Sequence, residues 1–125
     1  MTPEFKICSH CGNMVGVIRN AGVPIMCCGQ KMDTLVPNTT EASGEKHLPA
    51  VKVDGDVVTV NVGSVTHPMT EEHYIGWVYL HTENGGQRKA LKAGQEPEVK
   101  FALADDKAIA AYAWCNLHGL WKTEI

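Results

Sequence analysis

The sequence predicts an all-β protein in which a small metal-bound N-terminal domain is followed by an antiparallel β-sandwich. Four of the five cysteines fall within the first 28 residues of the 125-residue chain, a density typical of a metal-binding domain. The rest of the chain consists of short runs of β-branched and aromatic residues between turn residues, without a convincing amphipathic helix. We expect the N-terminal domain at residues 1–36, a linker at 37–44 and the sandwich at 45–125.

The four N-terminal cysteines predict one metal site, which we call centre I. They form a Cys8-x-x-Cys11 pair and an adjacent Cys27–Cys28 pair. In a reducing compartment such a set is more often a group of metal ligands than two disulfides, which are the alternative. Adjacent ligands must turn apart to reach one ion, so we expect a distorted tetrahedron. Zinc and iron both accept four sulfurs, and the spacing does not choose between them.

The predicted N-terminal domain is too small to be stable by itself. Chains below about 40 residues usually need a metal, disulfides or a partner chain in order to fold. The metal should therefore contribute much of the folding free energy, and we expect this domain to pair with a second copy. Between the two cysteine pairs, a strand is predicted at residues 14–19 and a turn at 20–22.

The sandwich is predicted from short strands at regular spacing. Polar turn-forming residues mark the linker, and alternating valines on both sides of Asp54-Gly55-Asp56 predict a hairpin. The predicted strands are residues 50–53, 57–62, 74–81, 98–103 and 109–115, with turns at 83–86 and 105–106. The alanine-rich residues 108–113 resemble a helical sequence, but the flanking aromatics and the glycine beyond them favour a strand.

Four histidines and the fifth cysteine predict a second metal site, centre II. Cys115 and His118 have the Cys-x-x-His spacing that lets one tight loop supply two ligands, while His47, His67 and His73 lie upstream in apolar or turn segments. Four imidazoles and one thiolate are one ligand too many for tetrahedral zinc. They suit a five-coordinate iron with one open position. The alternative is a buried structural cysteine with unrelated histidines.

Two charged residues beside His47 are candidates for catalysis at centre II. A ferrous ion with one thiolate and neutral imidazoles is a net cation, so its open face should attract a small anion. Cys115, as the axial ligand, would donate electron density toward that face. Lys46 is a candidate for attracting the anion and delivering protons, and Glu45 for occupying the open position of the oxidised ion. The alternative for both is a solvated charge pair.

The remaining histidines and the tryptophans are assigned no ligand role. His10 lies between two ligand cysteines and is predicted to be exposed, and His81 precedes a turn and is predicted to lie on the surface. Trp77, Trp114 and Trp121 are expected in the core, where the last two flank the metal loop and keep water from it.

Composition excludes several other classes of protein. The formal net charge is −3, which does not favour binding to nucleic acid or to an anionic membrane. No apolar run approaches the ~20 residues of a membrane span. The first residues lack the apolar segment of a signal peptide, so we expect a cytoplasmic protein.

These motifs together resemble the desulfoferrodoxins, the two-iron class of superoxide reductases, over essentially the whole chain. Centre I resembles the desulforedoxin-type site, including its adjacent cysteine pair. The segments that match the family's catalytic centre are Glu45-Lys46-His47, His67-Pro68-Met69 with His73, and Cys115-Asn116-x-His118. The resemblance implies two iron ions per chain, one in an Fe(Cys)4 centre I and one in an Fe(His)4Cys centre II.

The resemblance also implies an activity and partners. It implies an immunoglobulin-like sandwich, a homodimer, a rubredoxin-type electron donor, and one-electron reduction of superoxide to hydrogen peroxide without release of oxygen. Two other functions remain open at this point. A non-catalytic iron electron carrier would gain nothing from an open coordination position. A zinc-ribbon interaction module fused to a sandwich would leave Cys115 and four histidines unexplained.

Overall fold

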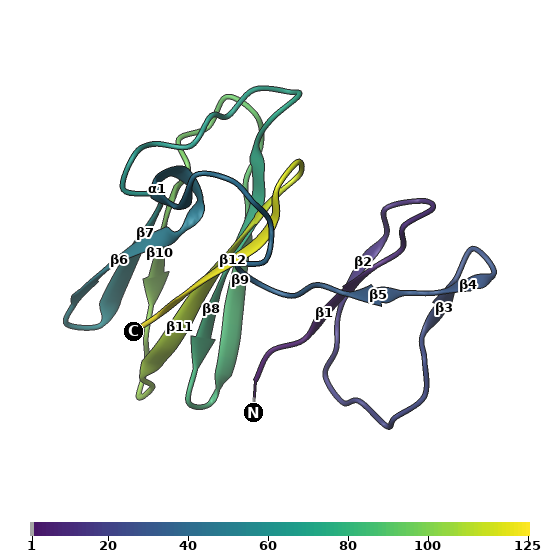
Figure 1. The fold of residues 1–125 in the computed structure, drawn as a ribbon. Coiled ribbons are helices and arrows are strands. Elements are labelled where there is room, and N and C mark those ends of the chain that lie inside the picture. The colour runs from purple at the N-terminus through teal and green to yellow at the C-terminus, as the bar shows by residue number, and fades with distance from the viewer. Residues whose placement is uncertain (1) are drawn as a thin grey trace. The chain divides into compact units, whose positions relative to one another are not determined.

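Strands make up nearly all the regular structure in the computed structural model, which describes residues 2–125 (Figure 1). The chain divides into two units, one ending at Val36 and the other beginning at Pro37. The all-β class predicted from the sequence is therefore confirmed. Among the described residues, no helix is long and apolar enough to cross a membrane.

The first unit is built from very short strands. Its three-stranded antiparallel sheet has the order β2 (Met14–Gly16), β1 (Phe5–Ile7) and β5 (Asp33–Thr34), and a separate hairpin joins β3 (Met26–Cys27) to β4 (Gln30–Lys31). The strand predicted at 14–19 thus ends after three residues. Within the described part of this unit only Phe5, Cys8 and Met32 are buried. So small a core cannot offset the conformational entropy of some 30 ordered residues without further cross-links.

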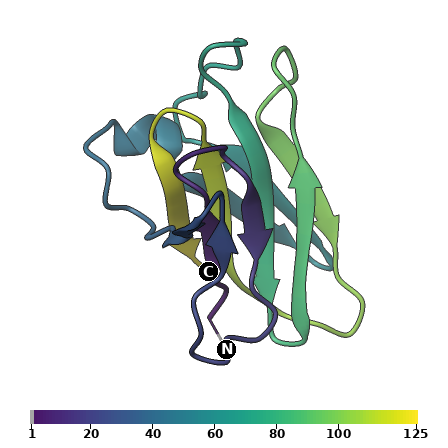
Figure 2. The same ribbon diagram turned by 90° about the vertical axis from the view of Figure 1, so that its right-hand side faces the viewer.

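The second unit is an antiparallel sandwich of seven strands in two layers. One sheet has the order β10-β7-β6 and the other β12-β11-β8-β9. The strands are β6 (Pro49–Asp54), β7 (Val57–Val62), β8 (Ile75–Thr82), β9 (Gly85–Ala90), β10 (Glu98–Ala102), β11 (Ala108–Cys115) and β12 (Gly119–Glu124). Figure 2 views the four-stranded sheet with the three-stranded sheet behind it. Sheets of three and four antiparallel strands are the immunoglobulin-like arrangement that was expected.

Alternation along the strands fills the space between the two sheets. Val58, Val60 and Val62 on β7 are fully buried and belong to the core cluster. On β11 the inward positions include Ala113 and Cys115, which places the thiol at the end of this core. Because side chains repeat with period two, this register buries Cys115 and turns its neighbours to the other face.

In the second unit, three elements differ in kind from the sequence prediction. A single helical turn, α1 (Gly44–His47), begins at the end of the predicted linker. Strand β9 begins inside the predicted turn at 83–86, where Gly86 lies beneath the Tyr79 ring with no room for a side chain. Strand β12 was not predicted at all. In both views α1, the β7–β8 connection and the β11–β12 turn lie toward the same end of the sandwich (Figures 1 and 2).

Candidate metal centres

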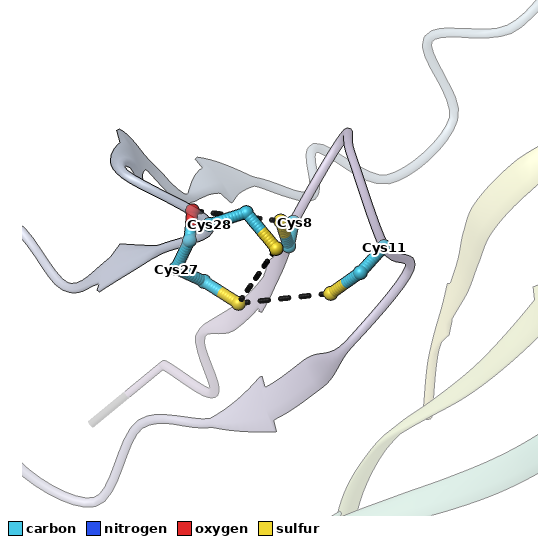
Figure 3. A group of neighbouring side chains, drawn as sticks. All are labelled: Cys8, Cys11, Cys27 and Cys28. Atoms are coloured by element: carbon cyan, nitrogen blue, oxygen red, sulfur yellow. Dashed lines mark hydrogen bonds between the residues drawn. The ribbon is translucent and has the colours of Figure 1, made fainter.

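The four sulfurs of centre I are arranged for one ion (Figure 3). All of them lie within 4.8 Å of one another. Cys11 Sγ is 3.6 Å from Cys27 Sγ, which is 4.0 Å from Cys28 Sγ. A disulfide would require about 2.05 Å, whereas metal–sulfur bonds of about 2.3 Å give a tetrahedron with edges of about 3.8 Å. The spacing fits a tetrathiolate site, and its unequal edges agree with a distorted tetrahedron.

The backbone explains how adjacent cysteines can face one ion. Cys28 has a φ of +53°, a left-handed conformation that few side-chain-bearing residues adopt. This turns its sulfur toward the same side as that of Cys27. In the first knuckle, the Gly12 N–H donates to the Cys8 carbonyl at 2.9 Å, and the Asn13 N–H points at Cys11 Sγ at 3.5 Å. Donors aimed at sulfur stabilise thiolate charge.

Electrostatics in centre I also require a cation. The Cys11 backbone N–H lowers the pKa of Cys8 to about 6, so one thiolate forms at neutral pH. Hydrogen bonding with Cys11 raises the pKa of Cys27, and raises that of Cys28 to about 12. The four thiols therefore do not ionise together unless a positive ion neutralises them.

Centre II is assembled from three segments at one end of the sandwich. His47 is the last residue of α1, His67 and His73 come from the β7–β8 connection, Cys115 ends β11, and His118 lies in the β11–β12 turn. Around the ring of four imidazoles, neighbouring centroids are 4.5 to 5.1 Å apart and nearly perpendicular. The His47 and His73 centroids, across the ring, are 6.1 Å apart. The four imidazoles thus form a square.

Hydrogen bonds outside the square fix which ring nitrogens face inward. His47 Nδ1 lies 2.7 Å from the Ser43 carbonyl, and His67 Nδ1 lies 2.6 Å from the Pro68 carbonyl. A carbonyl only accepts, so each Nδ1 carries the hydrogen and each Nε2 presents a lone pair. These two Nε2 atoms are 3.1 Å apart, and His118 Nδ1 is 3.0 Å from His47 Nε2.

These inward nitrogens fit a metal ion rather than a hydrogen-bond network. His73 Nε2 is buried without a hydrogen-bond partner, and the lone pairs of His47 and His67 face each other. Burial lowers the pKa of His47 and His73, and lowers that of His67 to about 4, so the rings stay neutral at pH 7. Two neutral imidazoles, those of His47 and His67, whose lone pairs face each other with no proton between them are stabilised by a cation that binds to both.

Cys115 supplies the fifth donor. Its sulfur is fully buried and lies 3.9 Å from His118 Nδ1. Burial raises the pKa of this thiol, while the backbone N–H groups of Leu117 and His118 act in the opposite direction. A thiolate in this place therefore depends on a neighbouring positive ion. The four imidazoles and this sulfur together supply five donors.

Comparison with known proteins gives the family. Residues 39–124 match the desulfoferrodoxin family model. A desulfoferrodoxin homologue of Archaeoglobus fulgidus is 42% identical over 98% of this chain and 99% of its own length, and the desulfoferrodoxin of Nitratidesulfovibrio vulgaris is 41% identical over 97% and 95%. The chain belongs to the desulfoferrodoxin family.

Solved structures agree with this membership of the desulfoferrodoxins. The superoxide reductase of Treponema pallidum has a TM-score of 0.85 and 42% identity, and the match covers 99% of this chain and 100% of the other. The one-iron superoxide reductase of Giardia intestinalis has a TM-score of 0.57 and 35% identity, over 65% of this chain and 97% of its own.

The desulfoferrodoxin chain places both predicted catalytic residues on α1. Glu45 and Lys46 are exposed, directly before His47. Burial is the main cause of the lowered pKa of His47 and His73. Repulsion from nearby positive charges, including that of Lys46, lowers both pKa values further. The Lys46 ammonium thus lies within electrostatic range of the square. His10 is exposed, while His81 is half-buried rather than fully on the surface.

Sequence reasoning missed the contacts by which Asn116 and Trp121 hold the ligands in place. The Asn116 amide bridges both neighbours of His73, accepting from the Tyr74 N–H at 2.9 Å and donating to the Glu72 carbonyl at 2.9 Å. Trp121 stacks on the His47 ring at 4.9 Å, and its indole N–H donates to the His118 carbonyl at 3.1 Å. An asparagine directly after a ligand cysteine was the available signal for the first of these contacts.

Proposed function

We propose that this desulfoferrodoxin is a superoxide reductase that converts superoxide to hydrogen peroxide at centre II. The observation that carries the proposal is the square of four imidazoles with one buried thiol beside it, which together supply five donors. The structural relatives from Treponema pallidum and Giardia intestinalis are both named superoxide reductases. The reaction consumes one superoxide, one electron and two protons, and it releases no oxygen.

We propose iron as the metal of both centres. Iron bound at centre II would supply one electron to superoxide and would then need to be reduced again by a donor. Five donors of this kind exceed the ligand number of a structural zinc site. Centre I, formed by Cys8, Cys11, Cys27 and Cys28, accepts either metal by geometry, and membership of the family supports iron there.

Each side chain around centre II has a proposed role. His47, His67, His73 and His118 would hold the metal through their imidazole nitrogens, and the Cys115 thiolate would donate electron density to it. Lys46 adds positive charge at the rim of the site, which draws in a small anion and helps to supply protons. Glu45, also exposed on α1, is proposed as the carboxylate that reaches the open position after oxidation.

We further propose a homodimer that takes its electrons from a rubredoxin-type protein in the cytoplasm. Among residues 2–36 only three are buried, yet this unit exposes 91% of Ile18, 71% of Val23 and 59% of Met26. Pairing with a second copy would cover such apolar surface. All five cysteines are free thiols, which suits a reducing compartment.

The proposed domain limits are 1–36 and 45–125, with 37–44 as linker.

The reaction can be tested by following both products. Pulse-generated superoxide is mixed with the reduced, iron-loaded chain, and peroxide and oxygen are measured together with the visible spectrum. We expect one peroxide for each superoxide consumed, no oxygen, and the growth of a thiolate-to-iron absorption band. Release of one oxygen for every two superoxide ions would indicate a dismutase, and the absence of any reaction would indicate an electron carrier.

A further inference from the structure

The turn that follows β7 lies very close to the backbone of α1. A Cβ atom added at Gly63 would lie 2.5 Å from the Glu45 carbonyl oxygen, 2.9 Å from the Lys46 carbonyl carbon and 3.0 Å from the Leu48 carbonyl oxygen. All three are backbone atoms, so no rotamer change could make room for a side chain. Gly63 is not among the residues with positive φ, so it is the close approach of two backbones that requires glycine here.

Hydrogen bonds from the same turn hold the Glu45 carbonyl. The Val65 N–H donates to it at 2.8 Å, and the Ser64 hydroxyl donates to it at 3.3 Å. The turn is itself fixed to the core, because Val62 is fully buried and its carbonyl accepts from the His67 N–H at 2.9 Å. We call residues 62–65 the glycine turn.

Helix α1 is too short to define its own position. It has four residues, its N-cap Ser43 makes no side-chain capping bond, and one hydrogen bond of 2.9 Å joins the Leu48 N–H to the Gly44 carbonyl. A single helical turn is unfavourable without tertiary support. The contacts of the glycine turn therefore determine where the peptide between Glu45 and Lys46 lies.

We propose that Gly63 is a positioning residue for Lys46. Because Gly63 has no side chain, the glycine turn can approach α1 closely enough to hydrogen-bond the Glu45 carbonyl. These bonds fix the peptide from which Lys46 extends at the rim of centre II. The proposal rests on the proposed role of Lys46 in drawing in superoxide. The new element is that the β7–β8 connection, which supplies His67, also determines the position of the Lys46 ammonium beside centre II.

The hydrogen bond from the glycine turn to the Glu45 carbonyl can be measured without any redox chemistry. In the zinc-loaded full chain, the Val65 amide should exchange slowly with solvent although the residue is 46% exposed, and NMR should detect a scalar coupling across its bond to the Glu45 carbonyl carbon. Gly63→Ala should accelerate this exchange on the order of tenfold or more. The matched control is Gly44→Ala, whose Cβ would meet only side-chain atoms of Leu48, at 3.4 and 3.9 Å; it should leave the exchange unchanged.

The consequence for catalysis is measured on the iron-loaded chain with pulsed superoxide. Gly63→Ala should slow the bimolecular step by up to about tenfold and weaken its dependence on salt, as expected for Lys46→Ala. The double variant should be no slower than Lys46→Ala alone, because both changes remove one interaction. Gly44→Ala should behave as the wild type.

Two results would overturn the proposal. One is the absence of both slow Val65 exchange and the coupling in the wild type, which decides the matter even where Gly63→Ala does not fold. The other is a folded Gly63→Ala chain with wild-type rate and salt dependence while Lys46→Ala is slow. A wild-type rate in Lys46→Ala would instead refute the role of Lys46, and the Val65 exchange would still report whether Gly63 fixes the peptide.

Discussion

The two metal centres differ in how much of each site the polypeptide builds before a metal binds. Centre I lies in a unit whose described part has three buried residues and strands of two or three residues. Centre II lies at the end of a sandwich whose core includes fully buried Val58, Phe101 and Leu80, and the outer nitrogens of His47 and His67 are already bonded to carbonyls. We therefore expect the first unit to need its metal in order to fold. The second unit should fold without metal and position its ligands in advance.

The difference has a physical cause in burial. Stabilisation from apolar burial grows with the size of the core. The sandwich core is large enough to offset the free energy lost by burying imidazole nitrogens close together. A unit of about 35 residues must instead obtain its stability from metal–thiolate bonds. Variants can be ordered by their expected effect on centre II, and each tests one side of this contrast.

The largest effect is expected for Cys115→Ser. The sandwich should remain folded, because the change is nearly isosteric, while the thiolate-to-iron band and nearly all superoxide reduction are lost. Cys115 is the only cysteine of the second unit, so no other thiolate can replace it. Circular dichroism, the visible spectrum and the rate with pulsed superoxide provide the check. A variant with wild-type spectrum and rate would show that another group is the fifth donor.

A smaller loss is expected for Asn116→Asp. The carboxylate can still accept from the Tyr74 N–H, but an oxygen replaces the amide donor that faces the Glu72 carbonyl. His73 should then be held less firmly, and metal affinity at centre II should fall about tenfold to a hundredfold, as is typical of groups that orient ligands. Competition with a chelator measures this affinity.

The matched control is Asn84→Asp, which removes a similar bond of 3.2 Å from a side-chain amide to the Asp105 carbonyl. It lies by the β8–β9 turn, away from the metal end, and should leave the affinity of centre II unchanged. Equal losses of affinity in the two variants would reduce the role of Asn116 to general stability.

Next in size is Lys46→Ala, which should slow the bimolecular reaction of superoxide with reduced centre II by about tenfold. The protein carries a net charge of −3, so attraction of an anion must come from local positive charge. Lys46→Arg should retain most of the rate, and Glu45→Ala should leave this first step nearly unchanged. Added salt should slow the wild type more than Lys46→Ala.

The control for charge alone is Lys52→Ala, which removes an exposed lysine on β6. Equal slowing by Lys52→Ala and Lys46→Ala would mean that net charge, rather than position beside the square, governs the rate.

The smallest effect on centre II is expected for Cys28→Ser. Loss of one sulfur should perturb or empty centre I, and the first unit should lose order because its stability depends on the metal. Centre II should nevertheless react with superoxide in a single turnover at the wild-type rate, since its five donors come from the second unit. Stopped mixing with metal analysis tests this independence. A slower reaction in a chain whose sandwich is intact would show that the two centres are coupled.

Much of the architecture was predictable because it follows from local patterns. Alternating valines predicted β7, and cysteine and histidine spacing pointed to two donor sets that the structure brings together. Strand β12 was missed because Trp121-Lys122-Thr123-Glu124 shows no clear apolar alternation; it is a strand because it pairs with β11.

The supporting contacts could not be predicted, because they join residues far apart in the sequence. Asn116 meets Glu72 and Tyr74 across 44 and 42 positions, and Gly63 meets Glu45 only after β6 and β7 have paired. Sequence reasoning identified candidate ligands from their chemistry, but which groups orient them depends on the tertiary fold.

Hydrogen exchange of the metal-free chain, followed residue by residue, tests the contrast between the two centres most directly. The chelated full-length protein is compared with the metal-loaded protein under reducing conditions. We expect the amides of β1, β2 and β5 to lose protection almost completely, while those of β7, β8 and β11 keep most of theirs. Two results in the metal-free chain would contradict this account: protection that persists in the first unit, or protection that is lost in the sandwich.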